Sequence, residues 1–142
     1  MKFQTEQDSI DFFTTQLTTS GFTNINATQS LDKYSFYDVY ADYKNKKCKF
    51  ELKRRDKDST DFGDSVIEMS KYANFLNEIV NGQIDQGYVV SFFNDIYTID
   101  SILNTHTIKS YQANQTTEFE NRKKVDKWFV CYNQEKKFKY NS

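Results

Sequence analysis

The fold is decided at SFYDVYADY (residues 35–43) and KCKFELKR (residues 47–54), two runs joined by residues 44–46. Each run alternates polar with apolar side chains, which is the pattern of a strand with one buried face. The short connection predicts a hairpin with its turn at Asn45-Lys46. In that register, Asp38 of the first strand lies opposite Lys53 of the second.

The hairpin sorts its side chains onto two faces, because successive strand residues point to opposite sides. One face is polar and carries Asp38, Tyr40, Asp42, Lys49, Glu51 and Lys53. The other is apolar and carries Tyr37, Val39, Ala41, Cys48, Phe50 and Leu52. A slip of one residue would send Lys53 to the apolar side, so the pattern opposes it. Two carboxylates, Asp38 and Glu51, and the amine of Lys53 therefore share a face, as in a divalent-metal site.

Length and composition predict a single folded domain over residues 1–142. Aromatic residues make up 17% of the chain, proline is absent and glycine occurs only 4 times, which argues against a disordered or linker-rich protein. The formal net charge of −1 gives no overall field toward nucleic acid. Basic residues nevertheless form two local clusters: Lys44, Lys46, Lys47, Lys49, Lys53, Arg54 and Arg55, then Arg122, Lys123, Lys124 and Lys127. Charge alone fits a solvated face equally well.

Both cysteines, Cys48 and Cys131, fall in apolar strand-like runs. Their spacing matches neither a zinc site nor a disulfide framework, so we expect buried free thiols. The longest apolar stretches are only a few residues, which predicts no signal peptide and no membrane span. We therefore expect a cytoplasmic protein without a membrane partner.

Helical periodicity predicts two helices. The first covers residues 4–20, is stopped by Gly21, and carries an apolar stripe of Ile10, Phe13 and Leu17. Glu6 lies four residues before Ile10 and continues that stripe. The second helix begins at Gly63 or Asp64 and runs to about Val80, with an apolar stripe that starts at Val66.

Further strands are expected at about residues 22–27, 86–93, 96–99, 125–132 and 136–140, whereas residues 105–121 show no assignable pattern. A strand–helix–strand unit implies a crossover and parallel pairing, so the expected fold is α/β with a mixed central sheet. Trp128, Phe129 and Tyr132 are expected in the core rather than on a stacking platform for bases. His106 has no partner at a catalytic spacing and receives no role.

Asp38 and the triplet Glu51-Leu52-Lys53 resemble the site of the PD-(D/E)XK nuclease superfamily, the restriction-endonuclease-like fold. That family has a core of helix, three strands, helix and strand. An Asp on its second strand and a (D/E)-x-K triplet on its third form the site. The resemblance covers residues 6–93 and implies a mixed central sheet flanked by helices, with extra C-terminal strands. Tyr37 stands where many members have proline.

The triplet itself occurs three times, as Asp42-Tyr43-Lys44, Glu51-Leu52-Lys53 and Glu135-Lys136-Lys137. Only the middle one combines a strand, an upstream acid on the same face and a following amphipathic helix. The alternative is an ordinary sheet with alternating charges on its solvated face. There, Asp38, Glu51 and Lys53 would form a cross-strand salt bridge worth under about 1 kcal/mol.

The resemblance implies phosphodiester hydrolysis with Mg²⁺, for which Mn²⁺ can substitute. Asp38 and Glu51 would hold the metal, with the backbone carbonyl of Leu52 as a third ligand. Lys53 would orient or deprotonate the attacking water and neutralise developing charge. Glu6 is a further metal-shell candidate from the first helix, and otherwise an acid favoured by the helix macrodipole.

Four basic residues are candidates for contacts to DNA: Lys49, Arg54, Arg55 and Lys71. Lys71 could reach either the site or the nucleic-acid backbone, and an ion pair with Glu68 is the alternative.

The leading expectation is a small Mg²⁺-dependent endo- or exodeoxyribonuclease, of phage or mobile-element origin, acting alone or as a homodimer. A catalytically inactive nuclease-fold module that binds DNA or a protein is the second hypothesis. An unrelated α+β interaction protein is the third.

Overall fold

The computed structural model describes residues 2–29, 37–61, 65–104, 106–114, 124–134 and 136–140 of the chain. These residues form an α/β protein with α1 (Glu6–Thr19) and α2 (Met69–Val80). Its strands are β1 (Thr23–Gln29), β2 (Tyr37–Tyr43), β3 (Lys46–Arg54), β4 (Ser65–Glu68), β5 (Gln86–Phe92), β6 (Ile96–Ser101), β7 (His106–Asn114), β8 (Lys124–Tyr132) and β9 (Lys137–Lys139). Neither helix of the described residues has the length and apolar character needed to cross a membrane.

The strands form two sheets. The larger has the order β1-β2-β3-β5-β6-β9, and the smaller has the order β4-β8-β7. All pairs are antiparallel except β3 and β5, which run parallel because α2 lies in the crossover between them. The expected mixed α/β sheet is thus confirmed, whereas the second sheet was not predicted.

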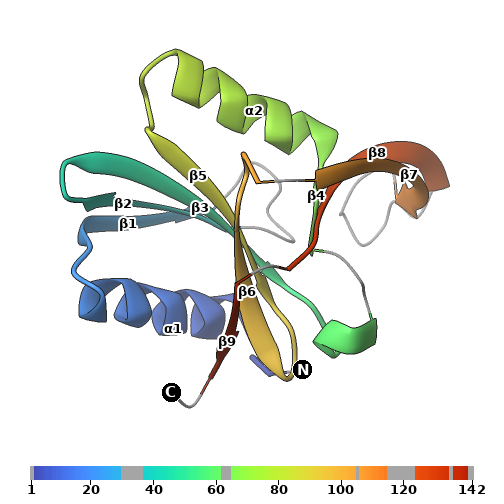
Figure 1. The fold of residues 1–142 in the computed structure, drawn as a ribbon. Helices are drawn as coiled ribbons and strands as arrows, with labels where there is room; N and C mark the ends of the chain where they lie inside the picture. The colour runs from blue at the N-terminus through green and yellow to red at the C-terminus, as the bar shows by residue number, and fades with distance from the viewer. Residues whose placement is uncertain are drawn as a thin grey trace.

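The two helices cover opposite faces of the larger sheet (Figure 1). On one face, Ile10, Phe13 and Leu17 of α1 pack against the apolar side of the β2–β3 hairpin. On the other face, Phe75 of α2 packs against Val89 of β5 and against the smaller sheet. The polar side of the hairpin therefore lies on the α2 side of the molecule.

The first helix begins with a capping box. Thr5 Oγ1 accepts a hydrogen bond from the Asp8 backbone N–H at 3.1 Å. The Asp8 carboxylate accepts one from the Thr5 N–H at 3.2 Å. Two amides at the helix start are thereby satisfied, which explains why α1 begins at Glu6.

The register of the β2–β3 hairpin differs from the predicted one by two residues. The turn is Lys44-Asn45, with positive φ at both positions (49° and 66°), which is the type I′ geometry that matches strand twist. Asp38 consequently lies opposite Glu51, and the predicted pairing of Asp38 with Lys53 is wrong. Because the shift is even, every side chain keeps its predicted face.

The second helix starts later than predicted. Its expected start at Gly63 or Asp64 lies outside the described residues, and Val66 belongs to β4 rather than to a helical stripe. Val66 pairs with Cys131 of β8, and its neighbour Ile67 is buried. The β-branched side chains suit this strand, so pairing with a distant segment overrides the local helical period.

Two further predictions have opposite outcomes. Cys48 and Cys131 are buried free thiols, as expected. Trp128 is 59% exposed, so its predicted place in the core is wrong, although Phe129 and Tyr132 are buried. Alternation along β8 explains only part of this difference in exposure. Trp128 lies on the same face as the buried Val130, but it lies beyond the part of that face that packs into the core.

Candidate active site

The predicted acidic pair lies between β2 and β3 on the face that α2 covers. Asp38 and Glu51 are directly opposite each other, which places their Cβ atoms about 4.5–5.5 Å apart. Glu51 is only 4% exposed, and Asp38 is partly buried. Lys53 follows on the same face, one alternation further along β3. The three residues thus lie on one face of the sheet, as the sequence predicts.

The second helix supplies positive charge to this pair. Lys71 Nζ lies 2.9 Å from Glu51 Oε1. Seven residues further on, and so on the same side of α2, Glu78 Oε1 lies 3.1 Å from Lys49 Nζ. The Lys49 amine also lies 4.7 Å from the ring centroid of Phe75. These contacts hold α2 over the polar face of the hairpin at two points.

Burial raises the pKa of Asp38 to about 6. The negative charges of Glu51 and Glu78 act in the same direction, and the positive charges of Lys49 and Lys71 oppose them. The fold therefore holds this carboxylate where its ionised form is disfavoured. An added cation beside Asp38 would favour the ionised form again.

Burial lowers the pKa of Lys53 to about 7, and the positive charges of Arg55 and Lys71 act in the same direction. The negative charges of Glu51 and Glu68 oppose this shift. An amine that is half neutral near pH 7 can accept a proton and return it at that pH. Perturbed groups of this kind cluster at functional sites.

The donor set fits a hard divalent cation. In the described ranges, no group of three or more His, Cys, Asp or Glu side chains is arranged to hold a metal. Mg²⁺, however, is commonly bound by one or two carboxylates and completes its octahedron with water and substrate oxygens. Asp38 and Glu51 supply two carboxylates. The side chain of Leu52 is apolar and buried, so only its backbone carbonyl could serve as a third ligand. Asp38 and Glu51 could thus supply two ligands to Mg²⁺ or Mn²⁺, but the two carboxylates do not make a closed protein cage.

Glu6 is not part of this group. Arg54 alternates with Lys53, so its side chain lies on the α1 face of the sheet. There its Nε donates to Glu6 Oε1 at 3.0 Å, and its Nη1 donates to the Phe3 carbonyl at 3.0 Å. The sheet separates Glu6 from Asp38, and the prediction that Glu6 lies near the acidic pair is wrong.

The predicted basic face for DNA is not formed as one exposed surface. Lys49 is 7% exposed and pairs with Glu78. Arg55 Nη2 donates to the Val66 carbonyl at 3.0 Å, and burial lowers the pKa of Arg55 to about 10. Arg54 is engaged with Glu6, and Lys71 reaches the acidic pair. Both faces of β3 are covered by helices, so these cations make internal contacts.

Two partners in ion pairs were not predicted from the sequence: Glu78 as the partner of Lys49, and Lys127 as the partner of Glu68. The signal for Glu78 was present, because a spacing of seven residues from Lys71 places both on one side of a helix. The contact of Glu68 Oε1 with Lys127 Nζ, at 3.1 Å, joins positions 59 residues apart and has no local signal.

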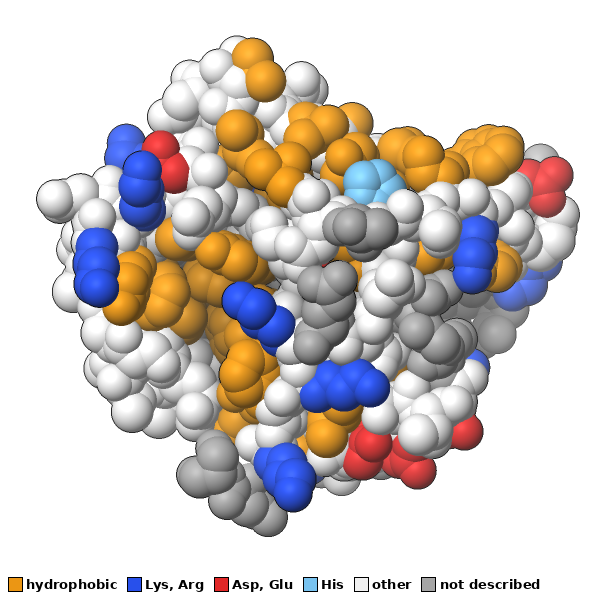
Figure 2. Space-filling view, in the orientation of Figure 1, with side chains coloured by type: hydrophobic (Ala, Val, Ile, Leu, Met, Phe, Trp, Pro, Cys, Tyr) orange, Lys and Arg blue, Asp and Glu red, His pale blue; other side chains and the backbone are white. Residues whose placement is uncertain are grey.

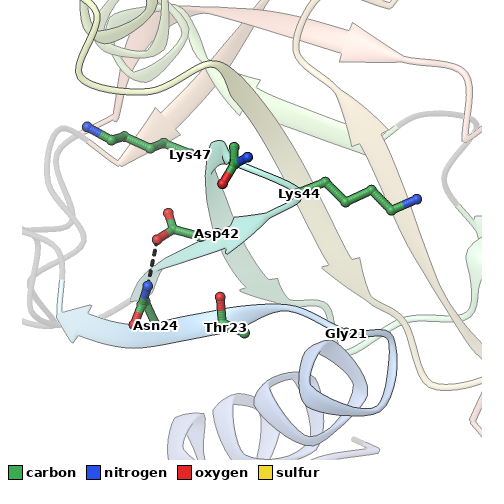
Figure 3. Close-up of a pocket in the computed structure, with 7 residues that line it drawn as sticks. Gly21, Thr23, Asn24, Asp42, Lys44 and Lys47 are labelled. Atoms are coloured by element: carbon green, nitrogen blue, oxygen red, sulfur yellow. Dashed lines mark hydrogen bonds between the residues drawn. The ribbon is translucent and has the colours of Figure 1, made fainter.

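A cavity of about 420 Å³ lies at the turn end of the β2–β3 hairpin and holds none of these residues (Figure 3). Its lining is Gly21, Thr23, Asn24, Asp42, Lys44, Asn45 and Lys47. Asn24 Nδ2 donates to Asp42 Oδ2 at 2.9 Å, while Lys44 and Lys47 extend to opposite sides. The lining offers a single carboxylate, the partly buried Asp42, so the hydrolytic chemistry is better supported at Asp38 and Glu51.

Comparisons with protein-family models, curated proteins and solved structures give no match.

Proposed function

We propose that the protein is a small metal-dependent nuclease that hydrolyses DNA phosphodiester bonds at Asp38, Glu51 and Lys53. One observation carries the proposal: Asp38 and Glu51 face each other across β2 and β3, with Lys53 on the same face. This is the arrangement that the resemblance to the PD-(D/E)XK superfamily implies.

The order of elements supports the finer assignment to the restriction-endonuclease-like fold. The chain runs α1, β1, β2, β3, α2, β5, apart from β4 before α2, and these strands lie side by side as β1-β2-β3-β5. The family core of helix, three strands, helix and strand has the same order. The strands β6 to β9 are additions to that core.

The chemistry follows from the placement of the side chains. A bound Mg²⁺ would polarise a phosphate oxygen and lower the pKa of its water. Asp38, Glu51 and the Leu52 carbonyl would hold it. Lys53 Nζ, with a pKa of about 7, would take the proton of the attacking water. In its protonated form, Lys53 would offset the negative charge that develops on the phosphate.

A catalytically inactive module on the same fold is the second candidate. The ion pair between Lys71 and Glu51 favours it, because it satisfies a buried carboxylate without a metal. The burial of Asp38 and Lys53 with perturbed pKa values argues against this second candidate. Such burial costs stability, and a sheet with a purely structural role gains nothing from it.

Cleavage of plasmid and single-stranded DNA in Mg²⁺, Mn²⁺ or EDTA tests the proposal. Wild-type protein should cut only with metal, and Glu51→Gln or Lys53→Met should reduce the rate by about 10²–10⁴-fold. Glu6→Gln is the matched control, since this acid lies across the sheet and should leave the rate near wild type. Full activity in Glu51→Gln would overturn the proposal, and metal-independent DNA binding without cleavage in wild type would favour the inactive module.

A further inference from the structure

The β7–β8 hairpin extends beyond the smaller sheet. Strand β4 pairs with β8 only over residues 129–132, whereas β7 pairs with β8 along its full length. Residues 110–114 and 124–128 therefore extend past the edge of β4 (Figure 1). Together with Ile108 and Lys109, which lead into them, they are called here the β-ribbon. An isolated two-stranded ribbon is marginally stable in water, so its retention calls for a function.

The β-ribbon exposes large aromatic side chains on both faces. Trp128 pairs with Ser110 and is 59% exposed, and Tyr111 pairs with Lys127 and is 44% exposed. Ile108 is exposed on the Trp128 face. Hydrophobic side chains also line the border that runs from α2 to the smaller sheet (Figure 2). Exposed rings of this size on a soluble protein mark an interaction surface.

The charges on the β-ribbon identify the kind of partner. It carries Lys109, Lys124 and Lys127 against the single acid Asp126, a formal charge of +2 in a chain whose total is −1. Lys109 and Lys124 are exposed, and Lys127 is half-buried. Flat rings beside lysines match the two chemistries of a nucleic-acid strand, because bases stack on the rings and phosphates pair with the amines. A purely apolar partner would gain nothing from the lysines.

Strand β4 connects the β-ribbon to the proposed active site. Ser65 Oγ of β4 and Ser91 Oγ of β5 are hydrogen-bonded at 2.6 Å, both fully buried. Ser91 in turn pairs with Lys53 across the parallel ladder. On the same strand, Glu68 contacts Lys127 of the β-ribbon, and its charge acts on the Lys53 amine. β4 thus links one end of the β-ribbon to the part of the larger sheet that carries Lys53.

We propose that the β-ribbon binds an unpaired stretch of nucleic acid, with a base stacked on Trp128 and one flanking phosphate on Lys124 of the same face. The other flanking phosphate lies around the edge strand β7, on Lys109 of the opposite face. The inference rests on the proposed function and adds how that site receives its substrate. Unpaired nucleic acid is favoured over a duplex because the exposed ring of Trp128 can stack only on a base whose face is accessible. In a duplex, neighbouring bases cover those faces.

The test uses Trp128 as its own probe, since it is the only tryptophan of the chain. The full-length Asp38→Asn variant in EDTA prevents cleavage while leaving the β-ribbon unchanged. Titration with a thymidine 20-mer should quench tryptophan fluorescence, and a duplex of equal length should bind more weakly. Raising the salt from about 50 to 200 mM should weaken binding, because phosphate contacts release counterions.

Variants measured by anisotropy of a labelled 20-mer complete the test. Trp128→Ala should bind about 10- to 100-fold more weakly, and Trp128→Phe should retain most of the affinity. Lys109→Gln with Lys124→Gln should lower the slope of log affinity against log salt by about 1.4. Both sets replace exposed side chains, and circular dichroism checks that each variant is folded.

The outcomes separate this inference from the proposed function. Absence of quenching with an unchanged affinity in Trp128→Ala would overturn the stacking site, as would tighter binding of the duplex. A change of oligomeric state in Trp128→Ala without nucleic-acid binding would instead assign the surface to a second copy of the chain, and would also overturn it. Hydrolysis of bis(4-nitrophenyl) phosphate tests Asp38 and Glu51 without the β-ribbon, so either proposal can fail alone.

Discussion

Asp38 is held in the folded protein at the expense of stability. Burial raises the pKa of this carboxyl to about 6, from 3.8 in the unfolded chain. Between those values the folded protein binds the proton and the unfolded chain does not, so the free energy of unfolding falls as the pH rises through that window. Natural proteins accept such costs mainly where a site needs them.

Asp38→Asn should therefore be more stable than wild type at pH 7. The full pKa change corresponds to about 3 kcal/mol, and partial exposure of the side chain reduces the expected gain to about 1–2 kcal/mol. At pH 3.5 Asp38 of the wild type is protonated in the folded state and mostly protonated in the unfolded state, so the two proteins should have similar stability. Urea unfolding at both pH values measures this, and an equal difference at the two values would contradict it.

Lys71 makes a second prediction at the residue scale. Its ammonium lies 2.9 Å from Glu51, in the position where a bound cation would neutralise the same oxygen. Lys71→Met should therefore increase Mn²⁺ affinity by about tenfold, because a competing charge has been removed. Lys127→Met, which breaks the pair with Glu68, is the control and should leave the affinity unchanged. Weaker Mn²⁺ binding in Lys71→Met would mean that Lys71 positions Glu51 for the metal instead.

Among the elements, α2 covers the polar face of the hairpin and places Lys71 and Glu78 there. The close approach of α2 to β5 depends on Gly87. A Cβ atom at Gly87 would lie 2.4 Å from Cδ1 and 2.8 Å from Cε1 of Phe75. Phe75 is fully buried and cannot move aside without shifting the helix. Glycine is therefore required here by packing.

Gly87→Ala should destabilise the protein by about 1–3 kcal/mol, because the added Cβ forces Phe75 and the helix away from β5. Gly82→Ala is a useful contrast. Its Cβ meets no atom within 4 Å, but the φ of +76° still costs about 1 kcal/mol, with no effect expected at the site. Unaltered stability in Gly87→Ala would show that α2 is not closely packed on β5.

Local patterns predicted some elements and missed others for physical reasons. The alternation in residues 35–54 predicted both faces of the hairpin, because period-two patterning survives a register shift of two. It did not predict the turn, since Lys44 at positive φ is an uncommon choice. Strand β4 was missed because Val66 fits a helical period, and only pairing with β8 decides otherwise.

At the scale of the whole molecule, the larger sheet has a core on each face. The sequence predicted that Asp38, Glu51 and Lys53 share one face, but it wrongly placed Glu6 of the first helix beside them. Placing α2 there required contacts between distant segments, such as Lys71 with Glu51. The same contacts turned Lys49 and Arg55 into internal cations rather than surface ones.

The two thiols test whether both sheets unfold together. Cys48 is buried in the core beneath α1, and Cys131 is buried in the smaller sheet. If the chain is one cooperative unit, Cys48→Ser and Cys131→Ser variants should each react with a thiol reagent only on global unfolding, at equal rates. Faster labelling of Cys131 would show that the smaller sheet opens independently.

The most direct test of the central claim, that Asp38 and Glu51 together hold a divalent cation, is a crystal structure with Mn²⁺. We predict an anomalous peak bridging the two carboxylates about 2.1 Å from their oxygens, with Lys71 Nζ displaced from Glu51. A structure at saturating Mn²⁺ in which Lys71 remains on Glu51 and no metal lies between the carboxylates would contradict the account.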